Sequence, residues 1–507
     1  MSAGLFLALR QAFPPDLDTV AIETADGARL SYTWRDLDQS SAQMANLLDS
    51  LALPRGARIA VQVDKSVEAL ILYLAVLRSG HVYLPLNPAY QSAELEYFLK
   101  DAEPAVLISA SRSLEAISRI VPEAVMHLYS LDDDRTGTLL ECSARMSGQQ
   151  VPAAVSENDL AVILYTSGTT GRSKGAMLSH GNLLSNARVL HHYWGWEASD
   201  VLIHALPIFH THGLFVAAQG ALLSGSRMIW FSRFEPKAVI ASFTEASVFM
   251  GVPTLYVRML HEAALSREAC RHMRLFVAGS APLLTETFLE WRERTGHTIL
   301  ERYGMSETVM LTSNPYFAAE GERCAGSVGL PLPGVELRIV DTQGCVAPPQ
   351  EIGGIEVKGP SIFRGYWRAP ELTREAFTPD GWFRTGDVGR IDRRDYVTIV
   401  GRSKDLIITG GYNVYPAEVE SYLNELPGIA ESAVIGVPHP DFGEAVIAVV
   451  VARPGARPEA AALIDELKRR IAGFKVPKRV FLMHELPRNV MGKVQKALLR
   501  QQHQGLF

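Results

Sequence analysis

Residues 160–175 read LAVILYTSGTTGRSKG, an apolar stretch that ends in a loop of hydroxyl side chains, glycines and one lysine. The apolar first half is typical of a buried strand. In the second half, the glycines let the backbone approach an anion and present several N–H groups to it, and Lys174 adds a positive charge suited to phosphate. The loop lacks the glycine, lysine and hydroxyl spacing of a P-loop, which argues against a simple kinase or NTPase. The stretch therefore predicts a strand followed by a phosphate-binding loop.

The regions on both sides of this stretch alternate between strand-like and helix-like patterns. From residue 59 to 108 the chain runs from RIAVQV through the helical SVEALILYLAVLRSG to AVLISA. After the loop, DVLIHALPIFH, RMIWFSRF, SVFMGVP and RLFVAGS are predicted strands with helical stretches between them. This alternation predicts an α/β fold with a largely parallel sheet.

The last third of the chain has a different texture. Residues 326–400 contain short strands separated by Gly and Pro turns, which predicts a β-rich subdomain. Beyond residue 401, strands and amphipathic helices fit a compact α+β unit of about 100 residues. We therefore predict a large N-terminal domain of αβ layers with a β-rich subdomain over residues 1–402. A small α+β C-terminal domain over residues 403–507 follows a short hinge.

Composition excludes several classes of protein. A chain of 507 residues needs more than one core, and its 47% hydrophobic and 21% charged residues are typical of a globular protein. The net charge of -6 without a basic block gives no support for a nucleic-acid partner. The longest apolar run, residues 69–77, is too short to cross a membrane, and the N-terminus does not resemble a signal peptide. The four scattered cysteines indicate neither a zinc site nor a disulfide framework. We expect a cytoplasmic monomer or small homo-oligomer.

Seven segments occur in the order found in the adenylate-forming superfamily, which contains acyl-CoA and aryl-CoA synthetases, luciferases and the adenylation domains of peptide synthetases. They are YTSGTTGRSKG (165–175), LPIFHTHGL (206–214), AGSAPL (278–283), ERYGMSET (301–308), GWFRTGDVGRID (381–392), GRSKDLIITGGYNVYPAEVE (401–420) and LPRNVMGKVQK (486–496). The chain resembles this superfamily over essentially its whole length. Where the family has threonine in YGMTE, this chain has Ser306, which keeps the hydroxyl.

The resemblance implies a binding site for ATP and Mg²⁺. The phosphate loop would hold the β- and γ-phosphates through Thr166, Ser167, Gly168, Thr169, Thr170, Gly171 and Lys174. The adenine slot would be formed by Gly279, Ser280, Ala281, Glu301, Arg302, Tyr303 and Gly304, with Tyr303 stacked on the base. Ser306 would bind the α-phosphate and Glu307 would hold Mg²⁺, a cation that prefers oxygen ligands. Asp387, assisted by Arg402, would accept hydrogen bonds from the ribose hydroxyls. A helix cap for Glu307 and a plain turn for Asp387 are the alternatives.

Lys493 is the residue that we expect to serve the first half-reaction, in which a carboxylate attacks the α-phosphorus of ATP. Two anions must meet there, and a lysine between them neutralises charge. The resemblance implies that the mobile small domain then swings about Lys404 so that the thiol of coenzyme A attacks the acyl-adenylate. Gly410 and Gly411 would line the pantetheine tunnel, and His210 would border the acyl pocket. A plain turn for the glycines and a core histidine for His210 remain alternatives.

Several segments, among them HALPIFHTHGL and LERYGMSET, resemble the malonyl-CoA synthetases within the superfamily. The second carboxylate of a dicarboxylic acid needs a cation, preferably arginine, whereas a fatty-acid pocket would be apolar. Arg258 and Arg302 lie in segments expected to face the acyl pocket, together with Ser280 and Met305. We favour Arg258, although it could lie on a helix surface, and Arg302 could instead pair with Glu301 or support the nucleotide site.

The sequence thus predicts ATP-dependent ligation of a small dicarboxylic acid to coenzyme A through an acyl-adenylate, with release of AMP and pyrophosphate. Malonate is the first choice of acid and methylmalonate the second. The alternatives are a medium- or long-chain fatty acyl-CoA synthetase, an adenylation enzyme that loads a carrier protein, and a catalytically silent relative.

Overall fold

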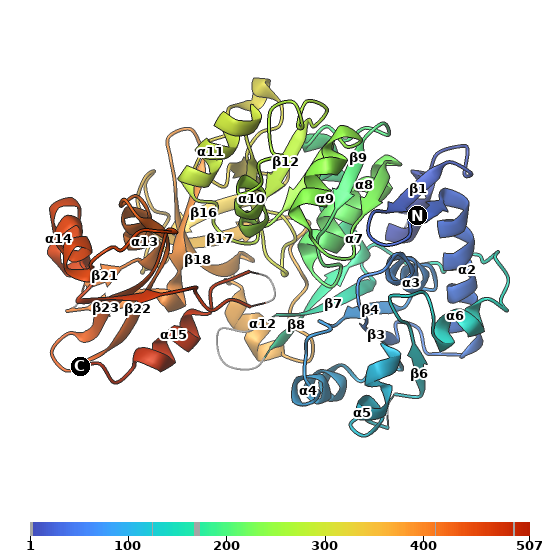
Figure 1. The fold of residues 1–507 in the computed structure, drawn as a ribbon. Helices are drawn as coiled ribbons and strands as arrows, with labels where there is room; N and C mark the ends of the chain where they lie inside the picture. Colours follow the sequence, from blue (N-terminus) through green and yellow to red (C-terminus); the bar gives the residue numbers. More distant parts are fainter. Residues whose placement is uncertain (1–3, 124, 167–172, 411, 490–491) are drawn as a thin grey trace.

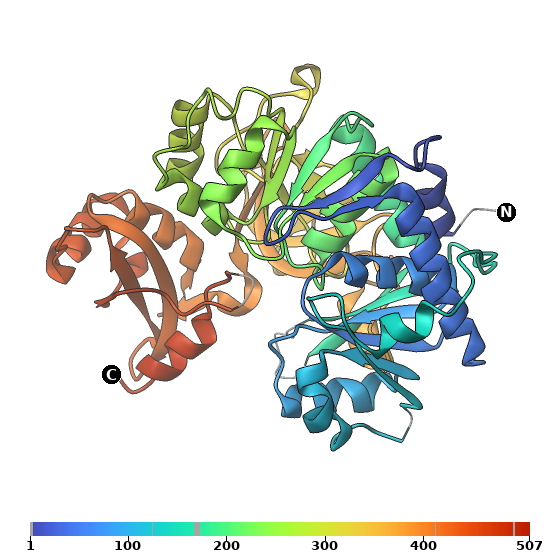
Figure 2. The same cartoon turned by 45° about the vertical axis from the view of Figure 1, so that its right-hand side comes forward.

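The structure is a computed structural model that describes residues 4–123, 125–166, 173–410, 412–489 and 492–507. Figures 1 and 2 show a large part, coloured from blue to orange, and a smaller part in red that holds the C-terminus. The described strands form four sheets, three in the large part and one in the small part.

Two sheets of the large part are mainly parallel. The first has nine described strands in the order β15 (Leu330–Pro331), β14 (Thr312–Ser313), β13 (Leu300–Tyr303), β12 (Leu275–Ala278), β11 (Val248–Gly251), β9 (Val201–His204), β10 (Arg227–Trp230), β1 (Val20–Thr24) and β2 (Ser31–Thr33). The second has the order β6 (His127–Ser130), β5 (Val106–Ser109), β3 (Arg58–Gln62), β4 (Val82–Pro85), β7 (Leu160–Thr166) and β8 (Lys174–Ser179). Antiparallel pairs occur only at the outer strands of these two sheets, as at β7–β8 and β13–β14.

The other two sheets match the two β-containing units that the sequence predicts. The β-rich subdomain is an antiparallel sheet of β16 (Glu336–Val340), β17 (Gly353–Lys358), β18 (Phe383–Ile391) and β19 (Val397–Arg402). The small part contains β21 (Tyr412–Val414), β20 (Ile407–Thr409), β23 (Gly443–Ala452), β22 (Ile429–His439) and β24 (Arg479–Met483). The predicted α/β class, with a β-rich subdomain and a small α+β unit, is therefore confirmed. The boundary between residues 402 and 403 stays a prediction.

Helices cover the sheets and fill the space between them. In the large part they are α1 (Leu5–Gln11), α2 (Trp34–Ser50), α3 (Val67–Arg78), α4 (Ser92–Ala102), α5 (Leu114–Ser118), α6 (Thr138–Ser143), α7 (His180–Tyr193), α8 (Gln219–Ser224), α9 (Pro236–Ala241), α10 (Pro253–Leu260), α11 (Thr285–Thr295) and α12 (Pro370–Ala376). In the small part they are α13 (Pro416–Asn424), α14 (Ala460–Arg470) and α15 (Lys496–His503). No helix in the described part of the chain is long and apolar enough to cross a membrane.

Helix α3 explains how one core joins the two parallel sheets. All of its residues are buried, as expected for a helix that is hydrophobic on every side. The Ser66 hydroxyl accepts a hydrogen bond from Ala69 N and caps its first turn. Together with α7 and α8, the helix packs into a single hydrophobic cluster that includes strands of both sheets. Several of the site residues described below lie on strands or in the turns next to them.

One predicted strand is shorter than expected. The stretch DVLIHALPIFH was expected to be extended throughout, but β9 ends at His204. Pro207 has no N–H group and cannot donate to a sheet ladder. The chain instead turns and enters a π-helix over His212–Ala218, a rare form that often occurs at functional sites.

Candidate active site

The phosphate-loop residues at the two ends of the loop lie opposite each other on the β7–β8 hairpin. Thr166 pairs with Lys174 in the antiparallel register. Lys174 Nζ lies 5.1 Å from the centre of the Tyr366 ring. The predicted loop residues Ser167, Gly168, Thr169, Thr170 and Gly171 lie outside the described residues. The hairpin therefore presents Lys174 at the position where the sequence predicts phosphate binding.

Glu307 contacts the same Tyr366 side chain as Lys174 does. The Tyr366 hydroxyl donates a hydrogen bond to Glu307 Oε1 over 3.1 Å. The Glu307 side chain is buried, and this burial raises the pKa of its carboxyl group. Ser306 precedes it in a half-buried loop. A single carboxylate suits Mg²⁺ that takes its other ligands from phosphates and water. No cluster of three or more metal-binding side chains occurs among the described residues.

Asp387 contacts two other residues of the predicted nucleotide site, Arg402 and Tyr303. It lies directly opposite Arg402 in the register of β18 and β19, and Arg402 Nε is 3.1 Å from Asp387 Oδ1. The Tyr303 hydroxyl donates to Asp387 Oδ2 over 2.6 Å. Each carboxylate oxygen keeps a free lone pair, so Asp387 has the capacity to accept two further hydrogen bonds. This capacity is what binding of two ribose hydroxyls requires.

Two glycines of the predicted adenine slot have no room for a side chain. A Cβ on Gly304 would lie 1.9 Å from the carbonyl oxygen of Val309, and a Cβ on Gly279 would lie 2.5 Å from the guanidinium carbon of Arg302. Ser280 has a φ of 72°, which is uncommon for a residue with a side chain. Its hydroxyl lies 3.3 Å from His212 Nδ1. Ala281, next along the turn, and Met305, which follows Gly304, are both half-buried.

Arg302 is the most unusual charge of the site. It is 3% exposed, and among the described residues its Nε and Nη2 atoms have no hydrogen-bond partner. Burial lowers the pKa of Arg302 to about 9. Among the described residues Glu301 makes no ion pair with it: one Glu301 oxygen accepts a hydrogen bond from Leu283 N at 3.0 Å, and burial raises the pKa of Glu301 to about 8. Neighbouring residues on a strand point to opposite faces, so the suggested pair of Glu301 and Arg302 does not form.

We expected Arg258 to face the acyl pocket, but its side chain is exposed to solvent. It lies on the exposed side of α10, and its guanidinium carbon is 4.9 Å from the centre of the Phe234 ring. The buried side of α10 is formed by Pro253, Tyr256 and Met259. Arg258 falls outside this helical stripe, and its side chain therefore points to solvent.

His210 and His212 lie at the entrance of the π-helix. Burial lowers the pKa of His210 to about 3, and the nearby Lys493 adds to the shift. Burial also lowers the pKa of His212 well below its usual value. Both imidazoles are therefore neutral at physiological pH. His212 was not among the predicted site residues, although it stands two residues after His210 in the same motif.

Lys493 reaches this site from the small part. Two hydrogen bonds join it to Asn489: Asn489 N donates to Lys493 O over 2.9 Å, and Lys493 N donates to Asn489 Oδ1 over 3.0 Å. The side chain is solvent-accessible along part of its length. Its amine nevertheless loses enough hydration between the two parts to lower the pKa of Lys493, and the Arg402 guanidinium adds to this shift. The charges of Asp387, Glu307 and Arg302 also act on it. The fold thus gathers residues from the whole chain around Lys493.

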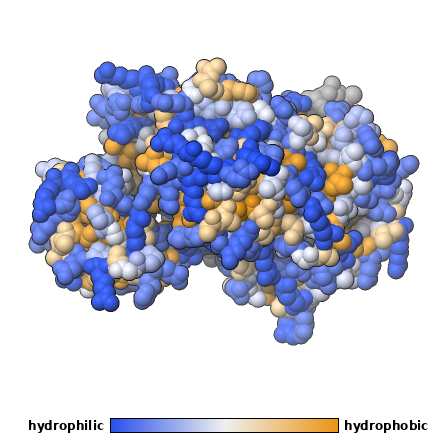
Figure 3. All heavy atoms as spheres, turned by 45° about the horizontal axis from the view of Figure 1, so that its top comes forward, coloured by the Kyte–Doolittle hydropathy of each residue, from blue (hydrophilic) through white to orange (hydrophobic). Residues whose placement is uncertain are grey.

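The predicted hinge and tunnel residues lie on the surface. Lys404 is exposed in a short 3-10 turn, Ser403–Asp405, between β19 and β20. Gly410 is exposed, has a φ of 56° and donates from its N–H to Phe442 O over 2.9 Å. Gly411 lies outside the described residues. Figure 3 shows the small part set off from the large part by a notch in the surface.

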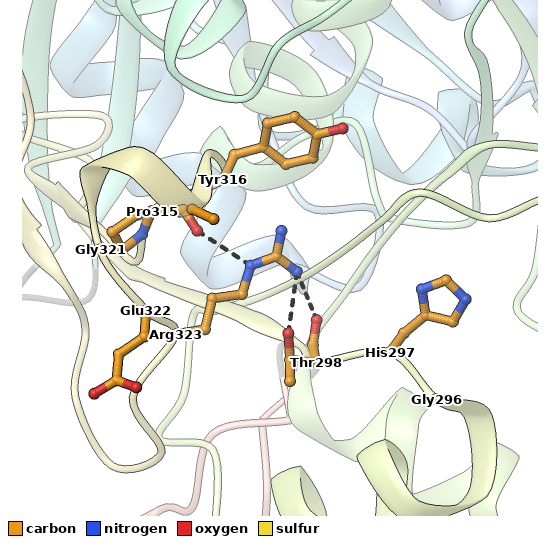
Figure 4. Close-up of a pocket in the computed structure, with 9 residues that line it drawn as sticks. Gly296, His297, Thr298, Pro315, Tyr316, Gly321, Glu322 and Arg323 are labelled. Atoms are coloured by element: carbon orange, nitrogen blue, oxygen red, sulfur yellow. Dashed lines mark hydrogen bonds between the residues drawn. The ribbon is translucent and has the colours of Figure 1, made fainter.

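A cavity of the large part lies away from these residues. Figure 4 shows it, with a volume of about 660 Å³, lined by Gly296, His297, Thr298, Pro315, Tyr316, Ala318, Gly321, Glu322 and Arg323. Within it, Arg323 donates to backbone carbonyls of Pro315 and Thr298 over 3.1 and 2.7 Å. None of the predicted site residues lines this cavity, so we assign it no part in the site.

Comparison with known proteins identifies the family. The model of the AMP-binding enzyme family matches residues 10–367, and that of the AMP-binding enzyme C-terminal domain matches residues 418–493. The malonate–CoA ligase of Arabidopsis thaliana is 34% identical, covering 95% of this chain and 86% of its own length. The crystal structure of ATP-bound MatB from Rhodopseudomonas palustris is 50% identical, covers 100% of both chains and superposes with a TM-score of 0.96.

The apo crystal structure of MatB from the same organism, 49% identical and covering 100% of both chains, gives a lower TM-score of 0.85. The present arrangement of the two parts is therefore more similar to that of the ATP-bound structure. With a family model that spans most of the large part and a second one in the small part, this chain belongs to the AMP-binding enzyme family, the adenylate-forming enzymes that its seven motifs predict.

Proposed function

We propose that this protein ligates malonate to coenzyme A at the expense of ATP, through malonyl-adenylate, with release of AMP and pyrophosphate. The relative from Arabidopsis thaliana is named for this reaction and matches nearly the whole chain. The observation that carries the choice of acid is the buried, unpaired guanidinium of Arg302.

Arg302 is the proposed partner of the distal carboxylate of malonate. A buried cation without a partner is costly, and the cost is removed when an anion binds to it. The free Nε and Nη2 atoms form one side of the guanidinium fork, which matches the two oxygens of a carboxylate. Ser280 and the neutral His212 lie beside it and add polar groups. Arg302 thus takes the place of Arg258 as the proposed partner of the distal carboxylate.

The other residues would position ATP and the reacting carboxylate. Asp387 accepts hydrogen bonds from the ribose hydroxyls, and Lys174 attracts the terminal phosphates. Glu307 would hold Mg²⁺, which supplies positive charge between the phosphate oxygens when bound. Lys493 lies between the entering carboxylate and the α-phosphate and reduces their repulsion. Ser306, which precedes Glu307 in the same loop, donates to the α-phosphate.

The second half-reaction requires Lys493 to leave. We propose that the small part turns about Lys404 and brings Gly410 and Gly411 toward the site, where the absence of side chains leaves room for pantetheine. The neutral His210 borders the acyl group and leaves no charge in the path of the thiol. The greater similarity to the ATP-bound structure than to the apo structure supports an adenylation arrangement for the present conformation.

A fatty acyl-CoA synthetase is disfavoured by the same arginine. An alkyl chain beside Arg302 would leave the guanidinium buried without a counter-charge. An adenylation enzyme that loads a carrier protein would use the same first step but a protein-bound thiol. A silent relative would have no reason to keep Lys174, Glu307, Asp387, Arg402 and Lys493 together.

The test is AMP formation with ATP, Mg²⁺ and coenzyme A across malonate, methylmalonate, succinate, acetate, octanoate and 4-coumarate. We expect malonate to be preferred in the wild type. Arg302→Met keeps the side-chain volume without the charge and should reduce malonate turnover by roughly a hundredfold or more, since it removes one partner of a buried ion pair. Arg258→Met is the matched control and should stay within about twofold of wild type, because Arg258 is exposed.

The other outcomes separate the alternatives. Turnover of octanoate without malonate would overturn the choice of substrate. AMP formation that needs a pantetheinylated carrier protein would identify the loading enzyme. No AMP formation with any acid would favour a silent relative.

We also propose a cytoplasmic location and a division into domains at residues 402 and 403. All four cysteines are unpaired thiols, which suits a reducing compartment. β19 ends at Arg402 and belongs to the β-rich sheet, whereas β20 at Ile407 begins the sheet of the small part.

A further inference from the structure

Residues 363–367 join two segments of the site that are far apart in sequence. Phe363 N donates to the backbone oxygen of Glu307 over 2.7 Å. Trp367 N donates to Gly175 O over 2.7 Å, and Met177 N donates to Gly365 O over 3.0 Å. Segment 363–367 therefore continues the sheet beside β8, the strand that begins with Lys174, and at the same time holds the loop that carries Glu307.

Tyr366 makes the same connection with its side chain. It is 9% exposed, and the Phe363 ring packs edge-on against it with ring centres 4.9 Å apart. Its hydroxyl donates to Glu307 Oε1 over 3.1 Å, and its ring centre is 5.1 Å from Lys174 Nζ. One rigid aromatic side chain thus contacts both the cation and the carboxylate.

We propose that Tyr366 is a positioning residue that fixes Lys174 and Glu307 relative to each other, so that both act on one triphosphate. The inference rests on the proposed function, in which Lys174 attracts phosphate and Glu307 holds the metal ion. The hydrogen bond to Oε1 selects one orientation of the carboxylate and leaves Oε2 for a cation. The ring face restrains the flexible lysine side chain through a cation–π contact.

The experiment measures ATP affinity by calorimetry, with Mg²⁺ and with EDTA, without acid or coenzyme A. Tyr366→Phe removes only the hydroxyl, and Tyr366→Leu also removes the ring. Tyr396→Phe is the matched control, because Tyr396 is 6% exposed and its hydroxyl donates to Glu322 O over 2.7 Å, in contact with none of the proposed ATP-binding residues.

We expect Tyr366→Phe to weaken ATP binding about fivefold in Mg²⁺ and to leave binding in EDTA unchanged, because the lost hydrogen bond orients only the proposed metal ligand. Tyr366→Leu should weaken binding in EDTA as well, by about threefold to tenfold, because Lys174 loses its aromatic support. Tyr396→Phe should match the wild type under both conditions.

Two results would count against the role of Tyr366, and a third would count against the proposed function. If Tyr366→Phe bound ATP in Mg²⁺ as tightly as the wild type does, Tyr366 would have no positioning role. If Tyr366→Phe lost ATP affinity equally in Mg²⁺ and in EDTA and also had a lower melting temperature, the role of Tyr366 would be merely structural. A wild-type protein that binds no ATP under either condition would instead overturn the proposed function, on which the inference rests.

Discussion

Gly279 and Arg302 are in direct contact: a Cβ placed on Gly279 would stand 2.5 Å from the guanidinium carbon of Arg302. The glycine belongs to the turn after β12, and the arginine lies on β13, the neighbouring parallel strand. The missing side chain therefore makes room for a buried arginine at the carboxyl ends of two strands. In α/β sheets this is the edge where ligands bind.

This contact predicts the effect of Gly279→Ala. The added methyl group pushes the Arg302 guanidinium away from its position, and we expect the KM for malonate to rise by roughly tenfold, because misplacement of a binding group by about 1 Å is costly. The KM for ATP should change much less. Steady-state kinetics with each substrate varied checks this. Gly473→Ala is the control, since a Cβ there meets no atom within 4 Å. Equal changes in both KM values would argue against a specific role of Arg302 in acid binding.

Lys493→Ala should separate the two half-reactions. We expect pyrophosphate exchange, which reports adenylation, to fall by roughly a hundredfold to a thousandfold because a charge at the reacting atoms is lost. Thioester formation from supplied malonyl-adenylate should remain close to wild type. Lys468→Ala, which removes an exposed lysine paired with Asp465 at 2.8 Å, should affect neither step. Loss of both half-reactions to a similar degree would contradict the role assigned to Lys493.

Asp387→Asn should weaken ATP binding while keeping the shape of the site. The amide is uncharged, so it cannot keep the ion pair with Arg402, and it has only one oxygen that accepts hydrogen bonds. We therefore expect the KM for ATP to rise by about tenfold or more. Titration calorimetry with ATP measures the effect directly. Asp380→Asn removes a carboxylate from an exposed pair with Arg338 and serves as the control. Unchanged ATP affinity in Asp387→Asn would exclude Asp387 from the ribose site.

His180 should make the protein less stable at mildly acidic pH. It is 1% exposed, its Nδ1 accepts from Leu5 N at 3.4 Å, and burial lowers its pKa to about 4. Because the unfolded state takes up the proton near pH 6.5 and the folded state only near pH 4, stability is lost as the pH falls through this window. Between pH 7 and pH 5 the loss from His180 amounts to about 2 kcal/mol.

Thermal unfolding at the two pH values tests this prediction. The melting temperature of His180→Asn should fall less between pH 7 and pH 5 than that of the wild type, since asparagine still accepts a hydrogen bond but does not titrate. His261→Asn, which replaces an exposed histidine, should follow the wild type. An identical pH dependence in His180→Asn and wild type would show that this histidine does not contribute.

The sequence by itself determined the family, the order of the three main units along the chain and the candidate residues that lie in short motifs. The strand and loop at 160–175, Asp387 opposite Arg402, and the loop from Gly304 to Glu307 depend on local spacing, because backbone conformation and side-chain direction over a few residues are set by periodicity and by glycine. Predictions that rested on such local rules remain consistent with the structure.

Only the tertiary structure distinguishes the environments of the two arginines, and our proposal of Arg302 rests on that difference. Both lie in segments expected to face the acyl pocket, but α10 turns Arg258 to solvent, whereas β13 buries Arg302 beneath Gly279. The spacing of the apolar residues Pro253, Tyr256 and Met259 already indicated that Arg258 lies off the buried face of the helix. Our prediction gave more weight to the position of Arg258 near a motif. The proposed role of Tyr366 could not be predicted from the sequence, because it depends on contacts with Lys174 and Glu307, which are distant in sequence. Contacts between remote segments are fixed by the packing of the whole core, and no local pattern encodes which of them meet.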